Sequence, residues 1–424
     1  DNVAQLTPCD DALDTSLFDR CFSGKCVGWS QTSLIPVADK VGAGFFDVDF
    51  FNQFFYSTGY VTSPYGTETS YVSSFKDGEF LTVHFESQQH DMRLTRMSHG
   101  VAVGTTDDGV RVLRKGAGGW TKDVGLTTAL NAMNSLFGTL GDVWGARLLG
   151  ENGESQDAYW FVGRNIASAT ALSRRCSRGS TNTNPLDWNC QNVPYSAYAA
   201  LDQPVRMAGA VAVPPSCTNP SICAGDLLGI THVANGVQAS EGVTAYLDWF
   251  DSDTGDAWEW NTASLTNATG SQEWRSVVRL EDGTAWGVGV GGLVAYDDGN
   301  LIPVSITIPE VVGVDWYAAT AVDGILIIPG IHKNVTTGSA GTVVEVSLVV
   351  ATHDLQASPG DPDFWFADTV AQWTVTCQGA QCTEQELNPL KIEAAASGNG
   401  RTYIVGSSTA GGVTKAWFAY VGPR

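Results

Sequence analysis

Three carboxylates stand close together in one short stretch of the sequence, Asp251, Asp253 and Asp256. Carboxylate oxygens at loop spacing are the ligands that Ca²⁺ prefers in proteins, so this stretch predicts a calcium site. The glutamate that closes an EF-hand loop is absent after it, and a tight turn in which Asp253 accepts backbone N–H bonds is the alternative. Both interpretations stay open, and calcium is the one cofactor that the sequence suggests.

The stretch from Asp251 to Trp258, DSDTGDAW, resembles the Asp-box of sialidase-like propellers, whose pattern is S/T-x-D-x-G-x-x-W. Asp253, Gly255 and Trp258 match the pattern, whereas Asp251 replaces the Ser or Thr of the first position. In that family the box is a structural turn between the third and fourth strands of a blade. The resemblance therefore implies a β-propeller with this stretch at such a turn.

Catalytic patterns are scarce. The sequence has no G-x-S-x-G elbow, no H-E-x-x-H and no P-loop. His84 and Glu86 alternate on one strand face, with His90 and Asp91 just beyond, and an ordinary strand histidine is a simpler interpretation than a metal site. A sialidase reaction would need an arginine cluster, which the strand positions do not assemble. A glycosidase needs only two carboxylates, and the 45 acidic residues can supply them.

The charge balance excludes some partners. With 23 Lys and Arg against 45 Asp and Glu among 424 residues, the formal net charge is −22, which repels a phosphate backbone. Nucleic acid is therefore not expected as a partner. No run of 18 apolar residues is present, so no membrane-spanning helix is expected. The 14 Trp and 12 Tyr could contact sugar rings or a protein partner.

The nine cysteines predict an oxidising compartment. Six of them form short-range pairs in polar stretches, with no zinc-type spacing, and are expected to be disulfides: Cys176 with Cys190, Cys217 with Cys223, and Cys377 with Cys382. Because nine is odd, two of Cys9, Cys21 and Cys26 should pair and one should remain. The chain begins at Asp1 rather than Met, which we interpret as an exported chain without its signal.

The segment from residue 1 to residue 30 lies outside the rest of the pattern and resembles the short Cys-rich segments of secreted proteins from myxobacteria and their relatives. Cys9-Asp10-Asp11, Cys21, Gly24 and Cys26-x-Gly28 carry this resemblance. One of the four cysteines of that pattern is missing, which accounts for the odd count.

The remainder, residues 31–424, contains a recurring unit of short apolar strands around a small-residue kink. The kink glycines are Gly59, Gly104, Gly163, Gly229, Gly289, Gly330 and Gly406. Seven such units predict an all-β, seven-bladed β-propeller, with six or eight blades, or a pair of sandwiches, as alternatives. The stretches at Asp142–Trp144 and Trp286–Asp298 also resemble the degenerate "DVWAVG" propeller repeats of the same secreted proteins.

Ring closure and several local elements can be predicted as well. Residues 33–38 repeat the Leu-Ile-Pro-Val of residues 301–304, which predicts an N-terminal strand that completes the last blade. Apolar spacing predicts a helix over 127–140, and the aromatic run at 45–56 predicts one buried strand. Trp144, Trp160, Trp286 and Trp417 are expected between blades. Asn267 and Asn334 head glycan acceptor patterns and mark surface loops.

These observations favour a secreted or cell-surface, non-catalytic interaction or structural module. Its expected partner is a protein, either a second copy or another surface molecule, or a carbohydrate. A spare thiol among Cys9, Cys21 and Cys26 could link copies into an oligomer or filament. The alternative function is a carbohydrate-active propeller enzyme, for which two carboxylates should converge in one pocket.

We expect mass spectrometry of the non-reduced protein to find the peptide pairs 176–190, 217–223 and 377–382, because these cysteines lie close together in the sequence. Alkylation before and after reduction provides the control. Free thiols at all six positions would argue instead for a reducing compartment.

Overall fold

The structure is a computed structural model that describes most of the chain. The described residues are 17–22, 25–85, 93–106, 109–132, 137–149, 155–165, 171–179, 184, 186–192, 205–213, 226–233, 241–252, 255–264, 274–279, 285–290, 292–297, 300–306, 308, 311–338, 341–358, 361–377 and 382–422. They divide between two compact units, one of residues 1–90 and 304–424 and one of residues 91–303.

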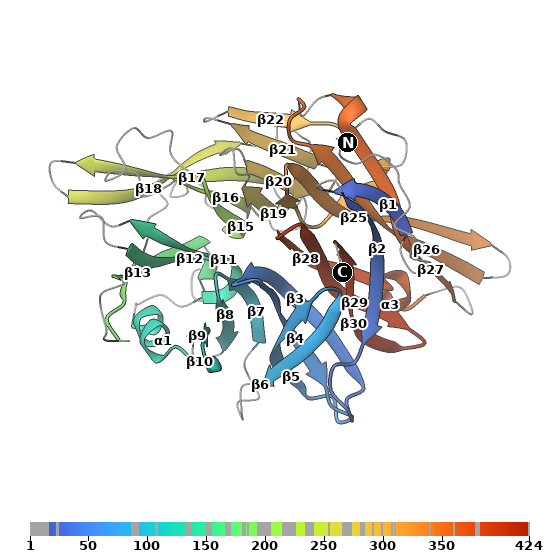
Figure 1. Cartoon of the computed structure of the whole chain (residues 1–424), viewed down its shortest axis with the longest axis horizontal. Helices are drawn as coiled ribbons and strands as arrows, with labels where there is room; N and C mark the ends of the chain where they lie inside the picture. The colour runs from blue at the N-terminus through green and yellow to red at the C-terminus, as the bar shows by residue number, and fades with distance from the viewer. Residues whose placement is uncertain are drawn as a thin grey trace. The chain divides into compact units, whose positions relative to one another are not determined.

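The first unit contains three antiparallel sheets (Figure 1). One is formed by β3 (Gly42–Phe51), β4 (Phe54–Thr62), β5 (Glu68–Lys76) and β6 (Glu79–Phe85). The second is formed by β28 (Leu390–Gly398), β29 (Arg401–Ala410), β30 (Val413–Val421), β2 (Lys25–Leu34) and β1 (Leu17–Phe22). The third is formed by β23 (Val314–Trp316), β24 (Thr320–Val322), β25 (Ile325–Gly338), β26 (Gly341–Asp354) and β27 (Trp365–Cys377). Two short helices accompany them, η3 (Pro362–Phe364) and α3 (Glu384–Leu387).

The second unit contains four four-stranded sheets. The first two are formed by β7 (Arg93–Ser98), β8 (Val101–Thr106), β9 (Gly109–Gly116) and β10 (Gly119–Lys122), and by β11 (Phe137–Leu149), β12 (Ser155–Asn165), β13 (Ala171–Gly179) and β14 (Asn189–Asn192). The other two are formed by β15 (Val205–Val213), β16 (Asp226–Val233), β17 (Glu241–Ser252) and β18 (Gly255–Ser264), and by β19 (Trp274–Arg279), β20 (Ala285–Gly289), β21 (Gly292–Asp297) and β22 (Asn300–Val304). The helix α1 (Val124–Asn131) follows β10.

The prediction of an all-β propeller is confirmed. Six of the seven sheets are antiparallel sets of consecutive strands, and in the remaining one β1 and β2 join β28–β30. Each of the seven recurring glycines lies on the second strand of its repeat, where β23 and β24 count as one interrupted first strand and β28 is the first strand of the last repeat. In most sheets the second strand does not end at the glycine. The strand runs on past the glycine, and the irregularity lies in the first strand.

In five sheets the glycine pairs with the residue at which the register of the first strand shifts: Gly59 with Phe45, Gly104 with Leu94, Gly163 with Leu140, Gly289 with Trp274, and Gly406 with Ile392. A bulge brings the first strand's backbone close to its neighbour. A Cβ on Gly406 would clash with the carbonyl oxygen of Lys391, and one on Gly59 would clash with that of Gly44. Only glycine fits this close approach.

The two chain ends meet in one sheet, as predicted. Strand β2 pairs antiparallel with β30, with Ser30 opposite Tyr420 and Leu34 opposite Ala416 (Figure 1). The segment predicted for this role, residues 33–38, starts three residues too late, because pairing begins at Ser30. Strand β2 also reaches back to Lys25, so residue 30 is not an element boundary.

Two local predictions are wrong. The helix predicted over 127–140 is α1, which begins after its N-cap Asp123 and ends at Asn131, and residues 137–140 belong to β11. Asp123 Oδ1 accepts the Leu126 N–H at 2.9 Å and starts the helix early. The aromatic run at 45–56 is a hairpin rather than one strand, because Asn52 and Gln53 have positive φ angles of 48° and 70° and form its turn.

Tryptophans connect sheets within the core. Trp160, Trp286 and Trp417 are buried, and the side chain of Trp144 lies outside the described residues. Trp417 packs in one apolar cluster with Ile327 and Val344 of the β25–β26 pair. It therefore occupies the predicted position between two sheets.

Replacing Gly406 with Ala should lower the free energy of unfolding by about 3 kcal/mol, since the new methyl group meets backbone rather than a side chain that can move. Urea unfolding of the variant measures this loss. Gly338→Ala is the matched control, because nothing lies within 4 Å of its added Cβ. Equal stability of the two variants would show that the bulge tolerates a side chain.

Candidate functional site

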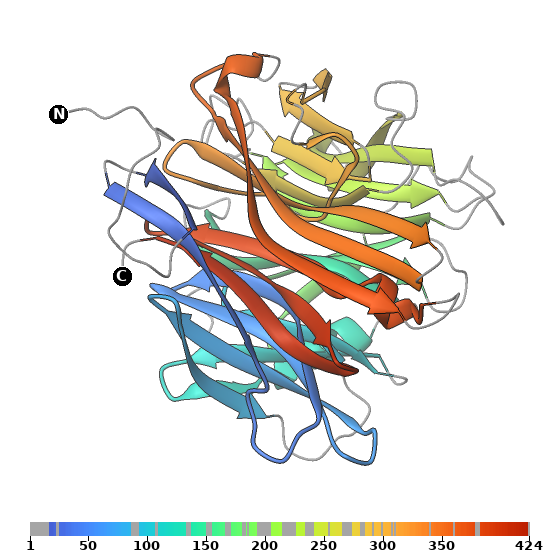
Figure 2. The same ribbon diagram turned by 90° about the vertical axis from the view of Figure 1, so that its right-hand side faces the viewer.

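A pocket of about 240 Å³ opens between the β23–β25–β26 sheet and the segment that leads into β28. Its lining residues are Gly313, Asp315, Tyr317, Ile331, Lys333, Val346, Leu387, Asn388 and Leu390. Figure 2 shows β25–β27 as long orange strands. Asp315 pairs with Ile331 in the ladder, and Lys333 pairs with Val346, so all four side chains stand on one face of this sheet.

The opposite wall is a single helical turn, α3, which has no buried residue of its own. Four residues cannot form a stable helix alone, so the turn depends on its attachments. A disulfide joins Cys377 at the end of β27 to Cys382 just before the turn. The Thr383 hydroxyl accepts the Glu386 N–H, and Glu386 Oε2 accepts the Thr383 N–H at 2.8 Å, which completes a capping box.

A hydrogen bond connects the two walls. Lys333 Nζ donates to Asn388 Oδ1 at 3.1 Å, while Asn388 Nδ2 donates to the carbonyl oxygen of Glu384 at 3.1 Å. One N–H and the oxygen of the Asn388 amide are thus engaged, and the ammonium group of Lys333 retains two further donors. Asp315 is the one carboxylate among the lining residues. The pocket combines an acceptor, a donor, a phenol and apolar walls.

The acidic stretch at 251–256 falls where the Asp-box resemblance placed it. Strands β17 and β18 are the third and fourth of their sheet, and Asp251 pairs with Asp256 at the end of the hairpin. Asp253 lies outside the described residues. No group of three or more metal-ligating side chains occurs among the residues that the structure describes. The calcium prediction stays untested.

A second acidic stretch, Asp361-Pro362-Asp363, forms a turn. Asp361 Oδ1 accepts the Asp363 N–H at 3.1 Å at the start of η3. This turn brings the Phe364 carbonyl oxygen to 3.2 Å from Nδ1 of His353, whose ring stacks on Trp365 at 4.5 Å between centroids. His353 is fully buried, and desolvation lowers its pKa below the usual value. Asp368, farther along, is buried in β27.

The structure describes some of the other residues that the sequence singled out, and the rest lie outside the described residues. The disulfides Cys176–Cys190 and Cys377–Cys382 are present. Cys26 is disulfide-bonded and lies opposite Cys21 in the β1–β2 register. Asn334 lies in β25 rather than in a loop; it is exposed and donates to Glu345 Oε2. His84 lies in β6 opposite Val72. Outside the described residues are Cys9, Cys217, Cys223, Asn267, Glu86, His90 and Asp91.

The structure assembles an arginine cluster that the sequence did not reveal. Arg114 and Arg178 lie over the Trp188 ring, with guanidinium-to-centroid distances of 5.2 and 4.7 Å. Arg175 lies over Trp160 at 5.4 Å. The directly paired strands β13 and β14, joined by the Cys176–Cys190 disulfide, bring Arg178 beside Trp188. Arg175 and Trp160 lie on the other face of this sheet, because side chains alternate along β13.

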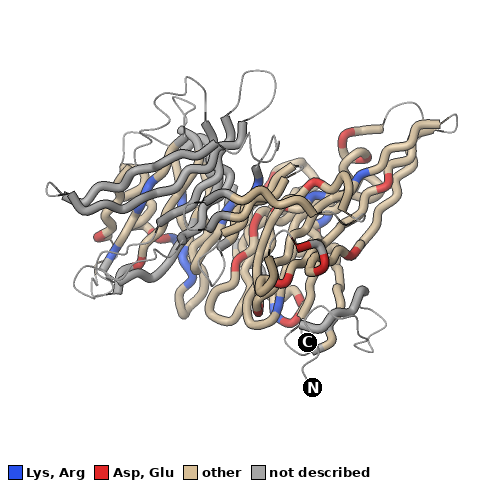
Figure 3. The backbone as a smooth tube through the Cα atoms, turned by 90° about the horizontal axis from the view of Figure 1, so that it is seen from above, with Lys and Arg blue, Asp and Glu red and all other residues tan. Residues whose placement is uncertain are grey.

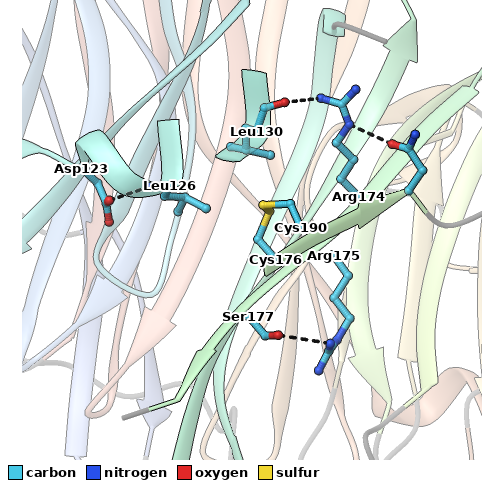
Figure 4. Close-up of a disulfide and its surroundings, with 9 residues drawn as sticks. Asp123, Leu126, Leu130, Arg174, Arg175, Cys176, Ser177 and Cys190 are labelled. Atoms are coloured by element: carbon cyan, nitrogen blue, oxygen red, sulfur yellow. Dashed lines mark hydrogen bonds between the residues drawn. A yellow bond between two sulfur atoms is a disulfide. The ribbon is translucent and has the colours of Figure 1, made fainter. Parts of the chain in front are cut away.

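These arginines have structural partners. Arg174 is fully buried, and its Nη1 donates to the carbonyl oxygen of Leu130 at 2.7 Å, at the end of α1 (Figure 4). Desolvation lowers the pKa of Arg174 to about 10. Arg114 Nε is 2.7 Å from Asp123 Oδ2, the residue that caps α1. The cluster therefore attaches α1 to two sheets, and it does not form an open cationic site.

Sequence reasoning missed the pocket. Asp315, Lys333 and Asn388 lie far apart in the chain, and no short motif contains two of them. One signal was present: Cys382-Thr383-x-x-Glu386 is a capping-box pattern directly after a cysteine, which predicts a braced helical turn. Acidic positions in the described part of the chain are scattered over many strands (Figure 3), so charge alone does not mark the site.

No protein-family model matches the chain, and no curated protein matches it in sequence. Among solved structures, it is similar to the β-propeller domain of the Trilobed protease from Pyrococcus furiosus (TM-score 0.43, 8% identity, covering 90% of this chain and 94% of that one). It is also similar to Trypanosoma rangeli sialidase (TM-score 0.35, 10% identity, 92% and 59%) and to Bacillus subtilis levansucrase (TM-score 0.32, 9% identity, 64% and 80%).

Acidification should destabilise the protein in part through His353. Its folded pKa is depressed, so the unfolded chain binds the proton more readily, and stability present above pH 6.5 is lost as the pH falls below it. Between pH 7.5 and 5.5 the wild type should lose more of its free energy of unfolding than His353→Asn does, as measured by urea unfolding. His332→Asn, whose ring is partly exposed, is the control. Equal losses in wild type and His353→Asn would remove His353 from this role.

Proposed function

We propose that this chain is a secreted or cell-surface binding module. It binds a small polar ligand in the pocket beside Asp315 and does not catalyse a reaction of that ligand. The observation that carries the proposal is the construction of the pocket wall. A disulfide, a capping box and the Lys333–Asn388 hydrogen bond all support one exposed helical turn. These three attachments hold in place a turn that has no buried residue of its own. A wall that is already ordered before the ligand binds lowers the entropic cost of binding.

Asp315 as the single lining carboxylate supports binding rather than glycoside hydrolysis. Retaining and inverting glycosidases place two carboxyl groups around the bond that they cleave. In this pocket a second carboxylate is missing from the lining residues. A carbohydrate-active enzyme remains the alternative function, and turnover of a glycoside would identify it.

The compartment is part of the proposal. Disulfides such as Cys176–Cys190 and Cys377–Cys382 persist in oxidising surroundings. Among the described residues no helix is long and apolar enough to cross a membrane. The disulfides are compatible with an exported protein, and the Cys-rich N-terminal segment resembles those of secreted proteins.

We also propose that the seven sheets are the blades of one ring, which β2 closes. The same hairpin suggests which cysteine remains unpaired. Since Cys26 is disulfide-bonded and lies opposite Cys21, pairing of these two would leave Cys9 as the ninth cysteine. Cys9 would then be the thiol through which two copies could be linked.

Filling the pocket should abolish ligand binding. Saturation-transfer NMR with a library of sugars, amino acids, carboxylates and alkylamines should detect binders of the wild type. We expect Leu387→Trp to lose them, since its ring would occupy the pocket. Leu81→Trp, on the exposed side of β6, is the matched control.

Two outcomes would count against the proposal. Binders that are retained by a folded Leu387→Trp variant would place the site elsewhere. Release of nitrophenol from nitrophenyl glycosides by the wild type, lost in Leu387→Trp, would replace the binding module with an enzyme.

A further inference from the structure

The charges in the pocket favour a neutral ligand. Asp315 and Lys333 contribute one formal charge of each sign, so the lining is neutral in sum. An anion would meet the Asp315 carboxylate in a chain of net charge −22, and a cation would meet the Lys333 ammonium. A ligand without net charge avoids both repulsions.

The hydrogen-bonding groups favour hydroxyls. The Asp315 carboxylate only accepts hydrogen bonds, and no hydrogen bond or ion pair occupies it within the described residues. The Lys333 ammonium group has three N–H donors and no acceptor. One of these donors binds Asn388 Oδ1. A hydroxyl group both donates and accepts, so neighbouring hydroxyls on one molecule can satisfy Asp315 and Lys333 together.

The remaining lining is apolar and small. Ile331, Val346 and Leu390 are buried, and Leu387 and the Tyr317 ring complete the walls. A volume of about 240 Å³ is below the ~300–1,000 Å³ of pockets for drug-sized ligands. Such walls suit a compact molecule that carries C–H faces beside its hydroxyls, and they leave no room for a long chain to be enclosed.

We infer that the ligand of this pocket is a neutral sugar ring. Hydroxyls of the ring donate to Asp315 and accept from Lys333, and its C–H face contacts Tyr317 and Leu387. This inference rests on the proposed function and adds the chemical class of the ligand. It assigns Asp315 and Lys333 as the residues that determine specificity.

The test uses methyl glycosides of glucose, galactose, mannose and N-acetylglucosamine as neutral probes. Acetate, inorganic phosphate, butylamine and glycine are the charged and zwitterionic probes. Titrations by NMR with the whole chain measure affinity. At least one glycoside should bind, and Asp315→Asn and Lys333→Met should each weaken it about tenfold, because each removes a hydrogen bond to a charged group.

Matched controls separate these effects from folding and from net charge. Asp363→Asn and Lys76→Met make the same changes at exposed positions that do not line the pocket and should bind as the wild type does. Thermal unfolding shows that each variant is folded. Should Asp315→Asn lose stability, Lys333→Met at its exposed position still tests the site.

The outcomes distinguish failure of the sugar assignment from failure of the proposed binding module. Glycoside binding that Asp315→Asn, Lys333→Met and Leu387→Trp weaken supports the inference. Pocket-dependent binding of acetate, phosphate, butylamine or glycine, with no glycoside bound, overturns the sugar assignment and leaves the binding module in place. If no probe binds in a way that depends on Leu387, both the inference and the proposed function fail.

Discussion

The close approach of the first two strands of a sheet is the constraint on which this fold depends. Where the first strand bulges, its carbonyl groups come so near the second strand that no side chain fits there. The chain meets this requirement with glycine in sheet after sheet. Because bulges increase local twist, one small residue per sheet determines how its strands curve. The repeat is visible in the sequence because this steric demand recurs.

The pocket is a local result of the same constraint. Gly330 pairs with Trp316 where the first strand breaks between β23 and β24, and a Cβ there would lie 2.5 Å from Val314 Cγ1. At this break the Tyr317 N–H donates to the Pro329 carbonyl oxygen outside the regular ladder. The interruption places Asp315 and Tyr317 at the pocket, beside the long strands β25 and β26. An uninterrupted first strand would continue the ladder and leave no pocket at this position.

The sequence predicts what short-range patterns control. The seven recurring glycines located one inner strand in each sheet. Where a turn needed no glycine, prediction failed: Asn52 and Gln53 turn the aromatic run back on itself, and no Asn-Gly or Asp-Gly pair marked the place. The pocket could not be predicted, because Asp315, Lys333 and Asn388 meet only after two sheets have packed. The arginines around Trp188 were missed for the same reason.

The pairing of β2 with β30 has a consequence for the order in which the protein is made. Ser30 is synthesised 390 residues before Tyr420, its partner in the ladder. During translation the early strand β2 therefore has no neighbour on that side until β30 has left the ribosome, and contacts of such long sequence separation form slowly. In the meantime, a β30 on another chain offers β2 the same hydrogen bonds. The disulfide at Cys26 and the short length of the paired segment, Ser30–Leu34, limit this exchange and favour closure within one molecule.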